Sequence, residues 1–304
     1  MRIVSLLASG TELVCALDAG DRLVGRSHEC DSPAWVRALP VLSRPTFDIT
    51  GSSREIDGLV RQHLQTGQAL YEVDQALLAA LAPDVLITQT HCEVCAVSPA
   101  DVERGTAAAL CRQQVVSLRA GTLAGILDSF MHVARVIGLE ENGRRLVDGL
   151  RARLIAVRDK THQLPHPTVT CLEWIDPVFA LGNWGPELVE CAGGLNVLGK
   201  AGEHSAAIPW EAVREADPDV LVVAPCGFGL QRTLEEIHVL ADKPGWRQLR
   251  AVRSDRVFVA DGNLYFNRSG PTMFETPDIL AEMLHPQAFP PSHEGQWWQH
   301  YVST

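Results

Sequence analysis

The sequence predicts an α/β protein with two lobes, mainly parallel sheets and a ligand cleft between the lobes. Short apolar runs rich in Val and Ile alternate with amphipathic helical runs along most of the 304 residues, a pattern typical of parallel sheets. The chain also repeats itself: residues 83–88 (PDVLIT) resemble 218–223 (PDVLVV), and residues 12–17 (ELVCAL) resemble 187–192 (ELVECA). Two similar α/β units therefore follow one another in the chain.

The first unit and the segment after it can be assigned from these patterns. We expect an N-terminal lobe at 1–119, with strands near 2–7, 22–26, 84–88 and 114–118 and helices near 11–18, 54–66, 74–81 and 99–111. A long helical bridge follows at 120–163, because apolar residues recur at helical spacing from 123 to 137. Gly138 divides the bridge into two helices, and Pro165 and Pro167 end it.

The second unit is expected at 164–285 and a separate tail at 286–304. Strands are predicted near 168–173, 178–182, 219–224 and 256–260, and helices near 185–192, 209–216, 232–241 and 272–284. The tail is rich in Pro and His and carries Trp297 and Trp298. We expect it to pack on its own lobe, and the alternative is a segment that binds a partner.

Composition and charge exclude several classes of function. The chain is 46% hydrophobic, enough for sizeable cores, and its net charge of −11 argues against a nucleic-acid-binding protein. No segment approaches the ~18 apolar residues of a membrane span, so no insertion into a membrane is expected. Met1 leads directly into a strand-like segment without a signal peptide. We therefore expect a cytoplasmic protein, whose eight cysteines stay reduced.

Four cysteines follow apolar strand-like runs, where an open α/β sheet places its ligand-binding loops. They are Cys30, the Cys-x-x-Cys pair Cys92 and Cys95, and Cys226. If the loops of both lobes face one cleft, four thiolates could bind Zn²⁺ or an iron–sulfur cluster. The alternative is that Cys92 and Cys95 are buried near a loop and Cys226 is unrelated. The other four cysteines fall within apolar patterns and are expected in the cores.

Polar residues beside these cysteines are further candidates for ligand contacts. His28 and Glu29 precede Cys30, and His91 precedes Cys92. Each histidine could bind a metal, including the cobalt of a corrinoid, through a neutral imidazole. The alternative for each is an ordinary hydrogen-bonded or solvated histidine.

Aromatic residues gather in the predicted loops of the second lobe. Trp174 and Trp184 each follow a strand, Phe228 follows Cys226, and Tyr265 lies in GNLYFNR before Arg268. Flat aromatic rings suit a large planar ligand, and an arginine could pair with a carboxylate or phosphate. The alternative is that one or two of these tryptophans close the core of the lobe.

The first strand of the chain leads into Ser9-Gly10-Thr11-Glu12, which we interpret as a strand-to-helix turn that favours anions. Ser9 and Thr11 are candidate contacts there, with Thr11 as a helix N-cap in the alternative. Tyr71 is a further candidate, and Asp74 is predicted to cap the next helix. No nucleotide fingerprint, G-x-S-x-G elbow or H-E-x-x-H motif is present. The sequence therefore indicates binding rather than turnover.

Several of these segments together resemble a known family. Residues 3–12 (IVSLLASGTE), 81–86 (LAPDVL), the helical bridge, 216–221 (ADPDVL) and 256–262 (RVFVADG) are similar to the periplasmic-binding-protein-like family of cobalamin- and iron-siderophore-binding components of ABC importers. The resemblance covers about residues 2–285 and is nearest to the branch labelled cobalamin-binding protein. It implies two Rossmann-like lobes bridged by a long helix, with the ligand between them. The four cysteines and the expected cytoplasmic address depart from the family's general pattern.

The resemblance leads to one main hypothesis and two alternatives. The main hypothesis is a cytoplasmic protein that binds a corrinoid such as cobalamin, or a related metal-containing ligand, with Trp174, Trp184 and Tyr265 packed on the macrocycle. The first alternative is a metal or iron–sulfur cluster protein that uses the cleft cysteines in a redox, sensing or enzymatic role. The second is the binding component of an ABC importer. No feature of the sequence indicates an oligomeric state.

Overall fold

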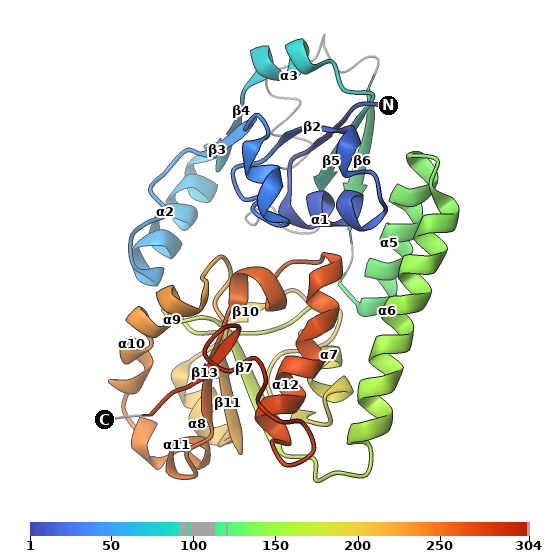
Figure 1. The fold of residues 1–304 in the computed structure, drawn as a ribbon. Coiled ribbons are helices and arrows are strands. Elements are labelled where there is room, and N and C mark those ends of the chain that lie inside the picture. The colour runs from blue at the N-terminus through green and yellow to red at the C-terminus, as the bar shows by residue number, and fades with distance from the viewer. Residues whose placement is uncertain (91–96, 98–112, 120, 303–304) are drawn as a thin grey trace.

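Two α/β lobes lie one above the other and are joined along one side by a pair of long helices (Figure 1). This computed structural model describes residues 1–90, 97, 113–119 and 121–302. Strands and helices alternate along the chain in both lobes, which confirms the predicted α/β fold class. Among the described residues, no helix is long and apolar enough to span a membrane.

Lobe one is built on a parallel sheet in the order β2-β1-β5-β6. Its strands are β1 (Ile3–Ser5), β2 (Leu23–Arg26), β5 (Val85–Gln89) and β6 (Gln114–Leu118). The α-helices described in this lobe are α1 (Ala8–Ala16), α2 (Ser53–Thr66) and α3 (Gln75–Leu81). A separate antiparallel pair is formed by β3 (Ser43–Pro45) and β4 (Tyr71–Val73). Two helices begin at side-chain caps. Ser52 and Glu55 form a capping box at α2, and the predicted cap Asp74 accepts a hydrogen bond from the Leu77 N–H at 2.9 Å. The helix predicted at 99–111 lies outside the described residues.

The start of α1 corrects one prediction. The helix begins at Ala8, so Ser9-Gly10-Thr11-Glu12 lies within it, and Thr11 is not its N-cap. Gly10 was misleading because glycine is a turn signal. In the structure it allows close packing instead, since a Cβ at Gly10 would lie 2.8 Å from the Ile87 side chain on β5.

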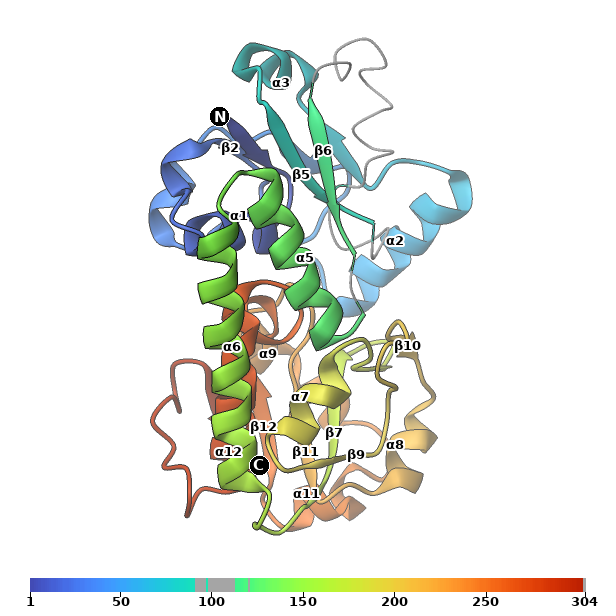
Figure 2. The same cartoon turned by 90° about the vertical axis from the view of Figure 1, so that its right-hand side faces the viewer.

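The bridge consists of α5 (Leu123–Val136) and α6 (Glu140–Thr161), which pack side by side (Figure 2). Gly138 connects them with a φ of +73°, a conformation that glycine adopts without strain. A Cβ at Gly143 would lie only 2.5 Å from the Ala134 side chain, so this glycine lets the two helices approach closely. The long helix α6 runs beside both lobes.

Lobe two is built on a mixed sheet in the order β10-β8-β7-β11-β12-β13, with β9 beside β7. Its strands are β7 (Thr168–Trp174), β8 (Phe179–Ala180), β9 (Leu195–Asn196), β10 (Ala206–Ala207), β11 (Val220–Val223), β12 (Val257–Ala260) and β13 (Trp298–His300), and its helices are α7 (Gly185–Cys191), α8 (Trp210–Ala216), α9 (Leu230–Glu236), α10 (His238–Ala241), α11 (Arg250–Arg253) and α12 (Thr276–Leu284). The neighbours β7, β11 and β12 are parallel, as predicted. Antiparallel strands flank them on both sides, because β8 returns beside β7 and the tail pairs with β12. The tail thus packs on its own lobe.

The cores explain why the bridge holds both lobes. In β11, Val220 and Val222 face one apolar core, while Leu221 and Val223 face another on the opposite side of the sheet. The first of these cores continues into α1 of lobe one and α5 of the bridge. Within it, the rings of Phe130 on α5 and Phe274 in the 3₁₀ helix η6 (Pro271–Glu275) lie 6.1 Å apart. One continuous apolar core therefore joins the lobes on the bridge side.

Replacing Phe130 by alanine tests this shared core. Its side chain is fully buried, and we expect Phe130→Ala to reduce the free energy of unfolding by about 3–5 kcal/mol, measured by urea denaturation. The control is Ile155→Ala on α6, whose side chain is 58% exposed. The control should change stability by less than ~0.5 kcal/mol. Equal effects of the two substitutions would contradict the shared core.

Candidate functional site

A cavity of about 110 Å³ lies between the two lobes. Its walls come from both lobes at the carboxyl ends of their parallel strands, where open α/β sheets bind ligands. Lobe one contributes Leu7, Ala8, Ser9, Glu29 and Gln89, and lobe two contributes Glu173, Leu181, Asn183, Trp184, His204, Cys226, Gly227, Asn263, Asn267, Arg268 and Ser269. The predicted candidates Ser9, Glu29, Trp184, Cys226 and Arg268 are thus brought together.

Arg268 reaches from lobe two into a group of lobe-one carboxylates. Its side chain is 9% exposed, and Nη1 lies 2.6 Å from Asp31 and 3.3 Å from Glu12. Its Nη2 donates to the Asn263 side-chain oxygen at 2.9 Å and to the Glu29 carbonyl at 3.4 Å. The guanidinium lines the cavity, but it is already paired with protein groups rather than left open for a ligand carboxylate.

Acidic side chains outnumber the one arginine at this point, and burial raises the pKa values of several of them. Burial raises the pKa of Glu29 to about 7; Arg268 acts against this rise and Asp31 adds to it. Burial also raises the pKa values of Glu12 and Asp261, although Arg268 lowers both. One cation therefore does not fully offset the cost of burying these carboxylates.

Four of the predicted candidates lie inside lobe one, away from the cavity wall. Thr11 donates to the sulfur of Cys30 at 3.0 Å, and burial raises the pKa of this thiol. His28 Nδ1 lies 2.9 Å from the Ser43 hydroxyl, and its ring lies 5.5 Å from that of Tyr71. Burial, followed by the nearby Arg26 charge, lowers the pKa of His28 to about 4. Burial therefore favours the neutral imidazole of His28 and the protonated thiol of Cys30.

Only part of the predicted thiolate site lies among the described residues. Cys226 lies on the cavity wall, whereas Cys30 is fully buried beneath α1. His91, Cys92 and Cys95 lie outside the described residues. Within the described part of the chain, no group of three His, Cys, Asp or Glu side chains could hold a metal ion. The zinc or iron–sulfur site stays a prediction.

The aromatic candidates take different positions. Trp184 lines the cavity and donates its indole N–H to the Phe266 carbonyl at 2.9 Å. Trp174 instead donates to the Ser53 carbonyl of lobe one at 3.1 Å, with its ring 5.2 Å from Phe228. Tyr265 is 4% exposed and is not part of the described cavity wall.

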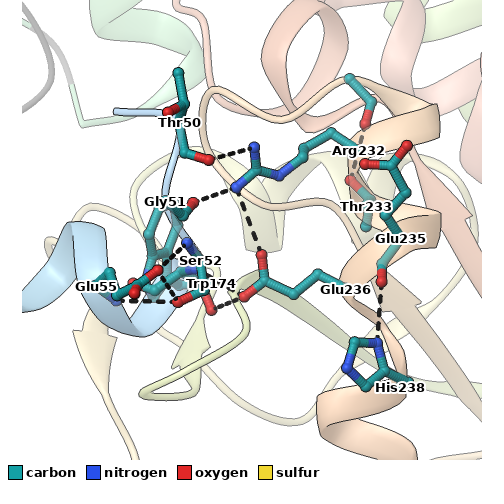
Figure 3. A network of polar contacts seen from close by, with 12 residues as sticks. Thr50, Gly51, Ser52, Glu55, Trp174, Arg232, Thr233, Glu235, Glu236 and His238 are labelled. Atoms are coloured by element: carbon teal, nitrogen blue, oxygen red, sulfur yellow. Dashed lines mark hydrogen bonds and ion pairs between the residues drawn. The ribbon is translucent and has the colours of Figure 1, made fainter. Parts of the chain in front are cut away.

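Opposite the bridge, a polar contact joins α2 to α9 across the lobes (Figure 3). The N–H and hydroxyl of Ser53 donate to the Glu236 carboxylate at 2.7 and 2.5 Å. Arg232 donates to the carbonyls of Thr50, at 3.2 Å, and Gly51, and its guanidinium lies 4.5 Å above the Phe228 ring. We call these contacts of Thr50, Gly51, Ser53, Arg232 and Glu236, together with the Trp174–Ser53 hydrogen bond, the α2–α9 latch.

Sequence reasoning missed two parts of this site. Asn183, Asn263 and Asn267 line the cavity together with Trp184. Asn183 lies between Gly182 and Trp184 in the sequence, a position that suggests a turn. Asparagine is one of the few non-glycine residues that adopt a positive φ, and its φ here is +50°. The latch had no local signal, because Ser53 and Glu236 are 183 positions apart.

A family model described as periplasmic binding protein matches residues 3–264. The chain belongs to this family. No curated protein matches the chain. Solved structures similar to this periplasmic binding protein family member include an ABC transporter substrate-binding protein from Listeria monocytogenes (19% identity, 93% of this chain and 98% of that one, TM-score 0.70). A vitamin B12 binding protein, BtuF of Vibrio cholerae, matches at 19% identity over 93% and 96% of the chains, with a TM-score of 0.65. A heme-binding protein from Pseudomonas aeruginosa matches at 23% identity over 100% and 98%, with a TM-score of 0.71.

Glu29 should make stability depend on pH. Its pKa is raised from 4.5 to about 7 by folding, so the folded protein binds this proton more tightly than the unfolded chain. Protonated Glu29 therefore favours the folded protein. This contribution to the free energy of unfolding is fully present below pH 4.5 and is lost as the pH rises through about 7. Glu29→Gln should therefore raise the melting temperature at pH 8 and change it little at pH 5, as measured by differential scanning fluorimetry. The control Glu215→Gln replaces an exposed carboxylate. An equal shift at both pH values would refute the assignment.

Proposed function

We propose that this protein binds a corrinoid such as cobalamin, or a related metal-containing ligand, between its two lobes in the cytoplasm. The observation that carries the proposal is the cavity shared by both lobes, whose wall includes Trp184 together with Asn183, Asn263 and Asn267. An indole offers a flat apolar surface to a macrocycle. Primary amides can both donate and accept hydrogen bonds, which suits the amide-bearing rim of a corrinoid. Similarity to the vitamin B12 binding protein of Vibrio cholerae adds support.

The size of the cavity implies that binding requires the lobes to separate. Pockets for small molecules typically measure about 300–1,000 Å³, whereas this cavity measures about 110 Å³. The apolar core on the bridge side joins the lobes through Phe130 and Phe274. The α2–α9 latch on the opposite side is polar, so its groups can exchange their partners for water. We therefore infer that the cleft opens at the latch.

The proposed location has a separate argument and a separate test. All five cysteines among the described residues are free thiols, which is typical of proteins in a reducing compartment. A second candidate function is the binding component of an ABC importer, favoured by the likeness to the Listeria monocytogenes substrate-binding protein. Cell fractionation of the native protein separates the two, because an importer component would be found outside the cytoplasm.

Titration with cobalamin tests the ligand. Purified protein should bind cyanocobalamin or hydroxocobalamin with a Kd in the micromolar range or below, seen as heat by calorimetry. If a histidine binds the cobalt, the visible spectrum of hydroxocobalamin should also change. Hemin serves as the comparison ligand and should bind more weakly, because its propionates would lie near the buried acidic groups around Arg268, where burial disfavours further negative charge. No binding of either cobalamin at micromolar concentrations would refute the proposed ligand.

Weakening the latch should favour binding of a macrocycle. In Glu236→Ala, Ser53 and Arg232 lose their shared carboxylate partner. The open state should then be more populated, and the apparent affinity for cyanocobalamin should rise about tenfold. Small-angle X-ray scattering of the ligand-free variant should show a larger radius of gyration. The matched control is Glu235→Ala, an exposed neighbour on the same helix. Weaker binding by Glu236→Ala would mean that the latch closes over the ligand instead.

A further inference from the structure

The C-terminal tail packs behind the loop that supplies three residues of the cavity. This loop, residues 261–268, contains the π-helical turn η5 (Gly262–Phe266) and carries Asn263, Asn267 and Arg268. The tail follows α12 and lies beyond the segment 3–264 that the family model matches. The tail residues that contact the loop therefore lie outside the matched segment.

Trp297 is the tail residue that contacts the loop. Its carbonyl accepts a hydrogen bond from the Asp261 N–H at 2.9 Å, at the start of the loop. Its ring lies 4.7 Å from the ring of Tyr265, in the middle of the loop. Asp261 in turn caps the π-helical turn by accepting from the Leu264 N–H at 2.8 Å. The tail thus contacts both the cap and the centre of this turn.

The opposite side of the loop packs on the segment that follows β11. A Cβ at Gly262 would collide with the backbone of Ala224 and Pro225, so the two backbones are in direct contact. The Asn267 side chain donates to the Ala224 carbonyl at 2.8 Å, and the Asn263 N–H donates to the Phe228 carbonyl at 3.0 Å. The loop is therefore held between the tail and the loop that carries Cys226.

Trp297 is held in place through His293, which is hydrogen-bonded to a buried carboxylate on α12. Glu282, 5% exposed, accepts from the Ser292 hydroxyl at 2.6 Å, from His293 Nδ1 at 2.6 Å and from the Trp298 indole at 2.9 Å. Burial alone would raise the pKa of Glu282, but these hydrogen bonds outweigh it and lower the pKa. The His293 ring stacks on Trp297 with centroids 3.7 Å apart and planes 9° apart. A continuous series of contacts runs from Glu282 to the cavity loop.

We propose that the tail braces the cavity loop, with Trp297 as the positioning residue that sets where Asn263, Asn267 and Arg268 lie in the ligand site. The part of this inference that concerns binding rests on the proposed function. The bracing itself is a property of the ligand-free protein and can be measured without any ligand.

The experiment compares Trp297→Ala with the wild-type full-length chain by hydrogen exchange of the peptide that covers 261–268. Loss of the aromatic contact should speed exchange in this peptide about tenfold and leave the strands of lobe two unchanged. Trp297→Tyr, which keeps an aromatic ring, should restore slow exchange. His293→Ala, which removes the ring that stacks on Trp297 and its hydrogen bond to Glu282, is a second variant in case Trp297→Ala does not fold.

Two controls separate bracing from general packing. Trp35→Ala removes an indole that is 49% exposed in lobe one, and Gln299→Ala changes an exposed residue of the same tail. Neither should alter exchange at 261–268. Unchanged exchange in Trp297→Ala would overturn the proposal, and so would faster exchange spread evenly over lobe two.

Binding of cyanocobalamin gives the functional readout. If wild-type protein binds it, Trp297→Ala should bind about tenfold more weakly, with Trp297→Tyr close to wild type. Equal binding by Trp297→Ala would overturn the positioning role. If wild-type protein does not bind cyanocobalamin while the loop exchange changes as expected, the bracing is supported and the proposed ligand is wrong.

Discussion

The relation between the two lobes depends on the apolar core that they share on the bridge side. Leu13 of α1, Phe130 of α5 and Phe274 of η6 belong to one buried cluster, and opening it would expose apolar surface to water. On the opposite side, the lobes meet through the hydrogen bonds of the α2–α9 latch. Such polar groups lose less when they separate, because water replaces the partner. The molecule is thus strongly joined on one side and weakly joined on the other.

Most of the fold could be predicted because its signals are local. Runs such as Val220–Val223 are apolar throughout, and both faces of the strand are buried between helices. Gly138 was interpreted correctly because a helix-ending glycine takes a positive φ. Gly10 was misinterpreted, since its role is close packing against Ile87, a residue distant in the sequence. The antiparallel strand β13 was likewise hidden, because its partner β12 is about forty residues away.

The site was less predictable, for a related reason. Three residues predicted from their position in loops after strands, Glu29, Trp184 and Arg268, lie on the cavity wall. The same rule also selected Trp174 and Tyr265, but their partners lie elsewhere in the chain. Ser53 of lobe one accepts the Trp174 N–H, and Trp297 of the tail packs against Tyr265. Local sequence identifies which residues lie near a cleft, while long-range contacts decide which of them face it.

The charges around the cavity also bear on the class of ligand. Arg268 is surrounded by Glu12, Asp31 and Glu29, and folding raises the pKa values of two of these carboxyls. A ligand with carboxylates of its own would add negative charge to a region where burial already disfavours it. A neutral, amide-bearing ligand or one with a cationic centre would not, and a positive charge would lower the cost of ionising Glu29. The charge distribution therefore disfavours a ligand with several carboxylates, which is consistent with the proposed amide-bearing ligand.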